Sequence, residues 1–215
     1  MKIEQVVVGQ LQTNCYLVWD EGSLEAVIID PGDDADYILR KISDFNLSPR
    51  CILATHGHFD HILAATELKL AFNIPLLIHK ADLFLIKRAG KTAKFFTGAG
   101  EEPVLPPDKF IGKRDKIRFG KESLRVIETP GHTPGSVSFY SPGFLFSGDL
   151  IFAEGVGRTD FTYSSEEKLQ ESIEKILRLP ANAIIYPGHG REFEIKNFLQ
   201  YQKKKPEDFI SKEVE

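Results

Sequence analysis

The most informative segment of this chain is Thr55-His56-Gly57-His58-Phe59-Asp60-His61, which holds three of its six histidines. In an extended loop, the side chains of His56 and His58 project to the same side, because residues two apart in extended backbone do so. We expect Asp60 and His61 to open a helix, with the Asp60 carboxylate at the positive end of the helix dipole. Four nitrogen and oxygen ligands within six residues suit a divalent metal ion, whereas leaving all four unpaired in a core would be costly.

Three further metal-capable side chains share one local pattern, in which an apolar strand ends, a glycine stands nearby and the polar residue follows. They are His132 after residues 124–127, Asp149 after residues 144–146 and His189 after residues 183–186. Glycine permits sharp turns and close backbone approach. Ligands from several strand ends can therefore converge on one edge of the fold. The remaining histidine, His79, lacks this pattern, and we predict it to be structural and outside the metal cluster.

The rest of the chain alternates β-branched runs with amphipathic stretches, and 215 residues favour one domain spanning residues 1–215. Strands are predicted at residues 3–8, 15–18, 26–29, 51–54, 76–78, 116–119, 124–127, 137–140, 144–146 and 183–186. Helices are predicted at residues 35–45, 60–72, 81–89, 166–179 and about 194–202. Ser164 and Glu167 would form a capping box for the fourth helix. The antiparallel-looking pairs 3–8/15–18 and 137–140/144–146 suggest two sheets with helices packed outside.

One stretch departs from this alternation. From Lys91 to Lys113 the chain is rich in glycine, proline and lysine and has little periodicity. We predict a long loop there, either a substrate-recognition lid or a disordered segment.

Charge and cysteine usage exclude several classes of protein. The formal net charge is −4, from 27 basic and 31 acidic residues, whereas nucleic-acid binders show a basic excess, so no nucleic-acid partner is expected. Residues 203–205, all lysine, are interpreted as a solvated face.

Cys15 and Cys51 lack CxxC spacing, which argues against a disulfide framework or a cysteine-rich zinc site. Cys51 should be a buried reduced thiol. No stretch has the length and apolarity of a membrane span or signal peptide, so we expect no membrane partner and a cytoplasmic location.

Together, the first segment and the three later residues resemble the dinuclear metal signature of the metallo-β-lactamase superfamily. The resemblance runs from about Asp30 to Gly190. It implies an α/β fold, a four-layer αββα sandwich, with two divalent metal ions, of which zinc is preferred over iron or manganese. Imidazole and carboxylate ligands do not by themselves choose between these metals. The resemblance assigns one metal to His56, His58 and His132, the second to Asp60, His61 and His189, and the bridging position to Asp149.

Several branches of the superfamily fit this chain less well. True lactamases generally lack the bridging aspartate, so Asp149 argues against antibiotic hydrolysis. The diiron oxygen reductases place a glutamate where this chain has His58, and the acidic charge balance argues against the tRNA-processing nucleases. The segment Gly155-Val156-Gly157-Arg158-Thr159-Asp160-Phe161 resembles a loop found both in glyoxalase II-like hydrolases and in persulfide dioxygenases. The ending Tyr186-Pro187-Gly188-His189-Gly190 is closer to the hydrolases.

Arg158 is the candidate substrate-binding residue. In glyoxalase II a lysine of this loop binds a carboxylate of glutathione, and Arg158 falls at that place, where it could grip a carboxylate in a bidentate way. A structural pair with Asp160 is an equal alternative. The glutathione-binding tyrosines of glyoxalase II are replaced here by Asp160 and Arg191, and only 26 residues follow His189. The chain is therefore most similar to the short, single-domain bacterial glyoxalase II-like hydrolases.

The expected reaction is hydrolysis of a small-molecule thioester, such as S-lactoylglutathione, by a metal-bound hydroxide. A thiol leaving group with a pKa of about 8.5 departs without a strong general acid, and the sequence offers no obvious acid beyond the ligands. Asp60 would be catalytic, because it would orient the nucleophile as well as bind metal. The alternative is an iron-dependent persulfide dioxygenase, with His56, His58 or His132 and Asp149 around one iron. A metal-free binding module is the third hypothesis.

Overall fold

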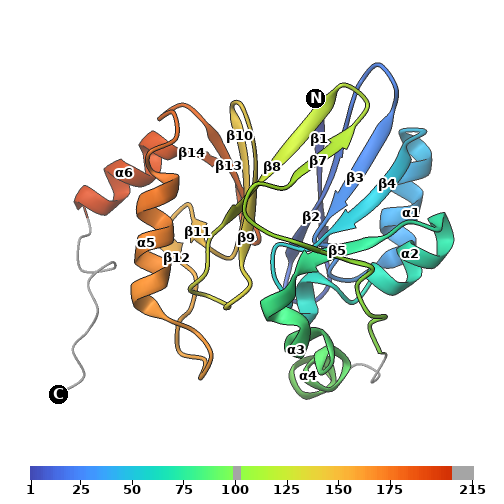
Figure 1. The fold of residues 1–215 in the computed structure, drawn as a ribbon, viewed down its shortest axis with the longest axis horizontal. Coiled ribbons are helices and arrows are strands. Elements are labelled where there is room, and N and C mark those ends of the chain that lie inside the picture. The colour runs from blue at the N-terminus through green and yellow to red at the C-terminus, as the bar shows by residue number, and fades with distance from the viewer. Residues whose placement is uncertain (99–102, 205–215) are drawn as a thin grey trace.

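Two six-stranded sheets face each other in the computed structural model, which describes residues 1–98 and 103–204 (Figure 1). The first sheet has the order β1-β2-β3-β4-β5-β6, with strands β1 (Lys2–Val8), β2 (Thr13–Trp19), β3 (Glu25–Ile29), β4 (Ser48–Leu53), β5 (Leu76–His79) and β6 (Lys109–Ile111). The second has the order β14-β13-β10-β9-β8-β7, with strands β7 (Lys116–Phe119), β8 (Glu122–Glu128), β9 (Val137–Ser141), β10 (Phe144–Gly148), β13 (Ile184–Pro187) and β14 (Phe193–Glu194). A hairpin of β11 (Ile151–Phe152) and β12 (Gly155–Val156) follows β10.

Helices cover the outer face of each sheet, so the fold is the αββα sandwich that the sequence predicts. The first sheet is covered by α1 (Ala35–Asp44) and α2 (Ala65–Phe72), and the second by α5 (Glu166–Ile176) and α6 (Ile195–Lys204) (Figure 1). Two short helices, α3 (Leu83–Ile86) and α4 (Ala89–Thr97), lie together below the first sheet in the view of Figure 1.

Three apolar layers hold the sandwich together, and β3 contributes to two of them. Ala26 and Ile28 join the cluster beneath α1 and α2, whereas Val27 and Ile29 join the cluster between the sheets. Successive side chains of a strand point to opposite faces. A strand buried on both faces is therefore apolar at every position, as β3 is over residues 26–29. A third cluster packs the second sheet against α5 and α6.

The directions of the strands bring the metal-capable residues to one edge. In the first sheet β3, β4, β5 and β6 run parallel. In the second, β8 and β10 are each antiparallel to β9, and β10 is parallel to β13, so β8, β10 and β13 run the same way. The carboxyl ends of strands that run the same way meet at one edge of a sheet. His132 follows β8, Asp149 follows β10 and His189 follows β13, so these residues share that edge.

Each predicted strand is present, but two helix starts differ from prediction. Residues Phe59–His61 form one 3-10 turn and α2 begins only at Ala65, so the predicted position of Asp60 at a helix N-terminus is wrong. Helix α5 is capped by Ser165, which accepts a hydrogen bond from the Lys168 backbone N–H at 3.3 Å. The predicted cap, Ser164, instead donates its hydroxyl to the His132 carbonyl at 2.7 Å.

The predictions for residues 81–113 also need correction. The predicted helix 81–89 is a 3-10 turn (Lys80–Asp82) followed by α3 and the start of α4. The predicted loop from Lys91 to Lys113 is wrong at both ends, because α4 extends to Thr97 and β6 pairs in parallel with β5. Residues 99–102 of this stretch lie outside the described residues.

The remaining predictions from composition can be compared with the described residues. Cys15 and Cys51 are buried and unpaired, and burial raises the pKa of the Cys51 thiol to about 12, as expected for a buried reduced cysteine. Lys203 and Lys204 are exposed at the end of α6, whereas Lys205 lies outside the described residues. Within residues 1–98 and 103–204, no helix combines the length and apolar character needed to cross a membrane.

Candidate metal centre

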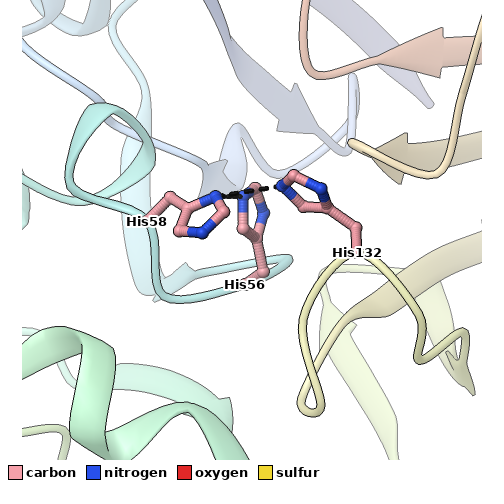
Figure 2. Close-up of side chains that lie close together, drawn as sticks. All are labelled: His56, His58 and His132. Atoms are coloured by element: carbon pink, nitrogen blue, oxygen red, sulfur yellow. Dashed lines mark hydrogen bonds between the residues drawn. The ribbon is translucent and has the colours of Figure 1, made fainter. Parts of the chain in front are cut away.

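The first group of candidate ligands consists of His56, His58 and His132. His58 Nδ1 lies 3.1 Å from His56 Nε2 and 3.0 Å from His132 Nε2, so three ring nitrogens point at one another (Figure 2). Burial, together with the neighbouring His132, lowers the pKa of His58 to about 3, and burial also lowers the pKa of His56 well below its usual value. Both rings are therefore neutral at pH 7, and this is the form that binds metal.

The second group consists of Asp60, His61 and His189. Asp60 Oδ2 lies 3.6 Å from His61 Nε2 and 3.4 Å from His189 Nε2. Burial alone would lower the pKa of His61, but Asp149 and Asp60 outweigh it and raise this pKa well above its usual value. The negative charge around the ring therefore favours a cation at this position.

Asp149 lies between the two groups. Its Oδ2 atom is 3.6 Å from His132 Nε2 of the first group and 3.7 Å from His189 Nε2 of the second, and its Oδ1 atom is 3.5 Å from His61 Nε2. One carboxylate thus faces both groups. This is the position that a bridging ligand requires.

Backbone carbonyls orient two of the imidazoles. His132 Nδ1 lies 2.8 Å from the Arg158 carbonyl oxygen, and His189 Nδ1 lies 3.1 Å from the Leu11 carbonyl oxygen. A carbonyl can only accept a hydrogen bond, so in each ring Nδ1 carries the proton. The Nε2 lone pair of each ring is then directed at the centre of the cluster, as in ligating histidines.

Asp30, which the sequence analysis did not single out, orients two more rings. Its carboxylate accepts hydrogen bonds from the Thr55 backbone N–H at 2.7 Å, the Thr55 hydroxyl at 2.6 Å and His61 Nδ1 at 3.0 Å. Because the Thr55 hydroxyl donates to Asp30, it accepts from His56 Nδ1 at 3.1 Å. Asp30 also lies within reach of His56 and His61 as a possible ligand. Because three groups already donate hydrogen bonds to its carboxylate, we assign Asp30 the role of positioning those rings.

The fit of a metal can be judged from two buried atoms. Among the described residues, His61 Nε2 and Asp149 Oδ1 are fully buried polar atoms without a hydrogen-bond partner. Buried polar groups are rarely left unpaired, and an ion is one of the ordinary explanations when they are. Both atoms point into the cluster, and both are donor types that divalent metals accept. The residues therefore fit two divalent ions.

Gly188 and Gly148 allow the cluster to be this compact. A side chain at Gly188 would collide with Asp149 Oδ1 and His61 Cε1. Gly148 has φ +53° and abuts the Thr55 side chain, so both its conformation and its surroundings favour glycine. These contacts explain why glycine accompanies the ligands in the sequence pattern.

A second unpredicted aspartate, Asp82, ties the two ligand-bearing loops together. Its Oδ2 atom accepts hydrogen bonds from the Gly57 backbone N–H at 2.9 Å and the Thr133 hydroxyl at 2.6 Å, and its Oδ1 atom accepts from the Gly135 backbone N–H at 2.7 Å. Gly57 stands between two ligands of one loop, and Thr133 follows His132 in the other. Asp82 has no exposed surface.

Tyr163 contacts the remaining ring. Its hydroxyl lies 2.9 Å from His58 Nε2, on the side of the imidazole away from the cluster, and its ring stacks on Phe161.

His79 lies outside the cluster: its Nε2 atom is 3.7 Å from Glu128 Oε1, and its Nδ1 atom accepts a hydrogen bond from the Ala81 N–H. The structure thus brings all seven predicted ligand residues together and leaves His79 out.

A cavity of about 550 Å³ opens over the metal-facing atoms, lined in part by His58, Asp60, His132, Asp149 and His189. Arg158 also lines it, but its guanidinium makes two hydrogen bonds to the Asp160 carboxylate, at 2.9 and 2.7 Å. The ion pair between Arg158 and Asp160, which the sequence allows as an alternative to substrate binding by Arg158, is therefore formed.

Comparison with known proteins gives the family. The model of the metallo-beta-lactamase superfamily matches residues 8–189. The chain is 34% identical over 198 residues to the "Probable metallo-hydrolase YqgX" of Bacillus subtilis, covering 91% of this chain and 93% of that protein. It is 35% identical over 194 residues to the hydroxyacylglutathione hydrolase GloC of Haemophilus influenzae, covering 88% and 91%. It is also 34% identical over 181 residues to the mouse mitochondrial persulfide dioxygenase ETHE1, covering 82% of this chain and 63% of that one.

Two solved structures are similar along almost their whole length. The BLEG-1 B3 metallo-beta-lactamase superposes with a TM-score of 0.86 at 35% identity, covering 93% of this chain and 97% of that one. A di-iron-bound form of TTHA1623 superposes with a TM-score of 0.84 at 35% identity, covering 92% and 98%.

Proposed function

The chain belongs to the metallo-β-lactamase superfamily, and we propose that it is a dinuclear metal-dependent hydrolase that cleaves a small-molecule thioester such as S-lactoylglutathione. The observation that carries the proposal is the position of Asp149 between two complete ligand groups. His56, His58 and His132 would hold one ion, Asp60, His61 and His189 the other, and Asp149 both. The hydrolase names of two relatives support the same class of reaction.

Two bound divalent ions would make hydroxide available near pH 7 and stabilise negative charge on an attacked carbonyl oxygen. The chain's own residues do the rest. Asp60 would orient the attacking water, and its Oδ2 atom is held in place by the Thr13 hydroxyl at 3.3 Å. The thiol of a thioester leaves with a pKa of about 8.5, so no strong acid needs to stand beside it. Arg158 remains the proposed binder of a substrate carboxylate, a role for which it would have to release Asp160.

The alternative is an iron-dependent persulfide dioxygenase. Its support is the Gly155–Phe161 segment and the identity to mouse ETHE1. Chemistry at one iron would use only the first histidine group with Asp149, and it would leave the second group without a role. The hydrolase accounts for both groups, which is why we prefer it.

The test is a panel of substrates with the purified, metal-quantified protein. We expect release of thiol from S-lactoylglutathione at about two metal equivalents per chain. Oxygen-dependent sulfite formation from glutathione persulfide, with no thioester cleavage, would replace the hydrolase by the dioxygenase. A β-lactam belongs in the panel because BLEG-1 carries the lactamase name. Cleavage of the lactam alone would also overturn the thioester assignment.

A further inference from the structure

The cavity beside the metal centre is walled mainly by apolar side chains. Phe161 lies with its ring 5.1 Å from that of His58 and 5.8 Å from that of His132, and Phe152 lies 6.3 Å from that of His189. Aromatic rings therefore stand directly beside both ligand groups. A substrate whose carbonyl reaches the metal-facing atoms through this cavity therefore lies close to these rings.

The outer part of the wall carries large apolar side chains in water. Phe96 of α4 is 59% exposed and Leu11 is 46% exposed, and both line the cavity. Phe96 is held in place by stacking on Phe59, with ring centroids 5.9 Å apart and planes 9° from parallel. Exposed apolar surface that borders a binding cavity favours a ligand that removes it from water.

Away from the metal-facing atoms, the cavity offers little to an anionic group of the substrate. Apart from its histidines, Arg158 is the single cation among the described residues that line it, and Arg158 is engaged by Asp160 in a two-point contact and lies 4.9 Å over the Phe161 ring. A carboxylate ligand would have to compete with Asp160 for the guanidinium. An apolar group would meet no such competitor.

We infer that the substrate carries an apolar arm of several carbons, attached to the thioester, that packs between Phe96 and Phe161. This inference rests on the proposed thioesterase function. It adds that selectivity comes mainly from apolar surface, with recognition of a glutathione carboxylate secondary. The arm can extend from the carbonyl carbon or from the sulfur, and the substrate series below separates the two.

Binding is measured by calorimetry with metal-loaded protein and non-hydrolysable ketones, in which a methylene stands between the carbonyl carbon and the sulfur. One series lengthens the acyl side from acetyl to octanoyl on a fixed thiol, and the other lengthens the thiol side on a fixed acetyl group. In one of the two series, each methylene that enters the cavity should tighten binding by up to about fourfold. Affinity that changes by less than about twofold along both series would overturn the inference.

Variants locate the arm. Phe96→Ala should reduce the preference for the longest over the shortest analogue by about tenfold, because most of the outer wall is removed. Phe110 of β6 is 48% exposed and does not line the cavity, so Phe110→Ala should leave this preference unchanged. A preference that survives Phe96→Ala intact would contradict the proposed location. Turnover of the matching thioesters is measured separately: absence of hydrolysis refutes the thioesterase, whereas the ketone affinities still decide the apolar arm.

Discussion

Replacing Asp82 by asparagine tests how the two ligand-bearing loops are held. The carboxylate accepts three hydrogen bonds, two on Oδ2 and one on Oδ1. An asparagine has a single carbonyl oxygen, so its best placement keeps the bonds from Gly57 and Thr133. Its amide NH₂ then faces the Gly135 N–H, and two donors oppose each other in a buried site.

The cost follows from that geometry. One charge-assisted hydrogen bond is lost, worth about 1.5–3 kcal/mol, and one buried donor is left unpaired at about 1–3 kcal/mol. Part of this is offset, because burial raises the pKa of Asp82 and so penalises its ionised form in the wild type. We expect a net loss of about 2–4 kcal/mol in the free energy of unfolding, or about 5–15 °C in Tm. Affinity for the metal of the first group should fall by about 10–100-fold, because the residues that fix its ligands are loosened.

The assay is thermal unfolding followed by circular dichroism, with and without chelator, together with metal titration. Asp108→Asn is the matched control, because Asp108 accepts the Leu76 N–H and pairs with Lys69 on the surface, away from the ligand loops. It should leave metal affinity unchanged. If Asp82→Asn unfolds within about 2 °C of the wild type and binds metal equally well, the argument that Asp82 anchors these loops is wrong.

Further outcomes follow from the same contacts. Asp149→Asn should lose at least one metal equivalent together with activity, and two retained metals with near-normal turnover would remove the bridging role. Arg158→Ala should raise KM by about 2–5-fold for a thioester bearing a carboxylate, because the exposed guanidinium has to release Asp160 to bind it, and should leave a neutral thioester less affected; equal effects on both would take Arg158 out of the substrate site. Tyr163→Phe should weaken metal binding by about tenfold through the lost bond to His58, and unchanged affinity would make the contact incidental. With chelator present, the difference in unfolding free energy between the wild type and Asp82→Asn should be largest below pH 3.8, the usual pKa of an aspartate. It should shrink as the pH rises through the raised pKa of Asp82 in the folded protein. A difference that grows with pH would mean that folding lowers this pKa.

The sequence predicts the fold and the clustering of the candidate ligands because both depend on local order. A candidate ligand such as His132 or His189 comes a few residues after the end of a strand and next to a glycine, and strands that run in one direction bring such residues to one edge. Asp30 obeys the same pattern, since it directly follows β3 and precedes Pro31-Gly32. That signal could have identified Asp30 from the sequence.

Other features depend on contacts between distant residues and leave no local pattern. Asp82 holds residues 25 to 53 positions away in the chain. Tyr163 reaches His58 across 105 positions. The periodicity of residues 91–97 is too short to reveal α4, which is stabilised by tertiary contacts such as the stacking of Phe96 on Phe59. The apolar cavity likewise forms only when α4 and the loop containing Phe161 come together.

Anomalous scattering from crystals of the zinc-loaded protein tests whether one cluster holds two metal ions. We expect two peaks about 3.5–4 Å apart, with each ligating imidazole nitrogen about 2.0–2.1 Å from its ion. One peak should lie among His56, His58 and His132, the other among Asp60, His61 and His189, and Asp149 should contact both. A single peak under saturating zinc, or a second peak that Asp149 does not touch, would contradict this expectation.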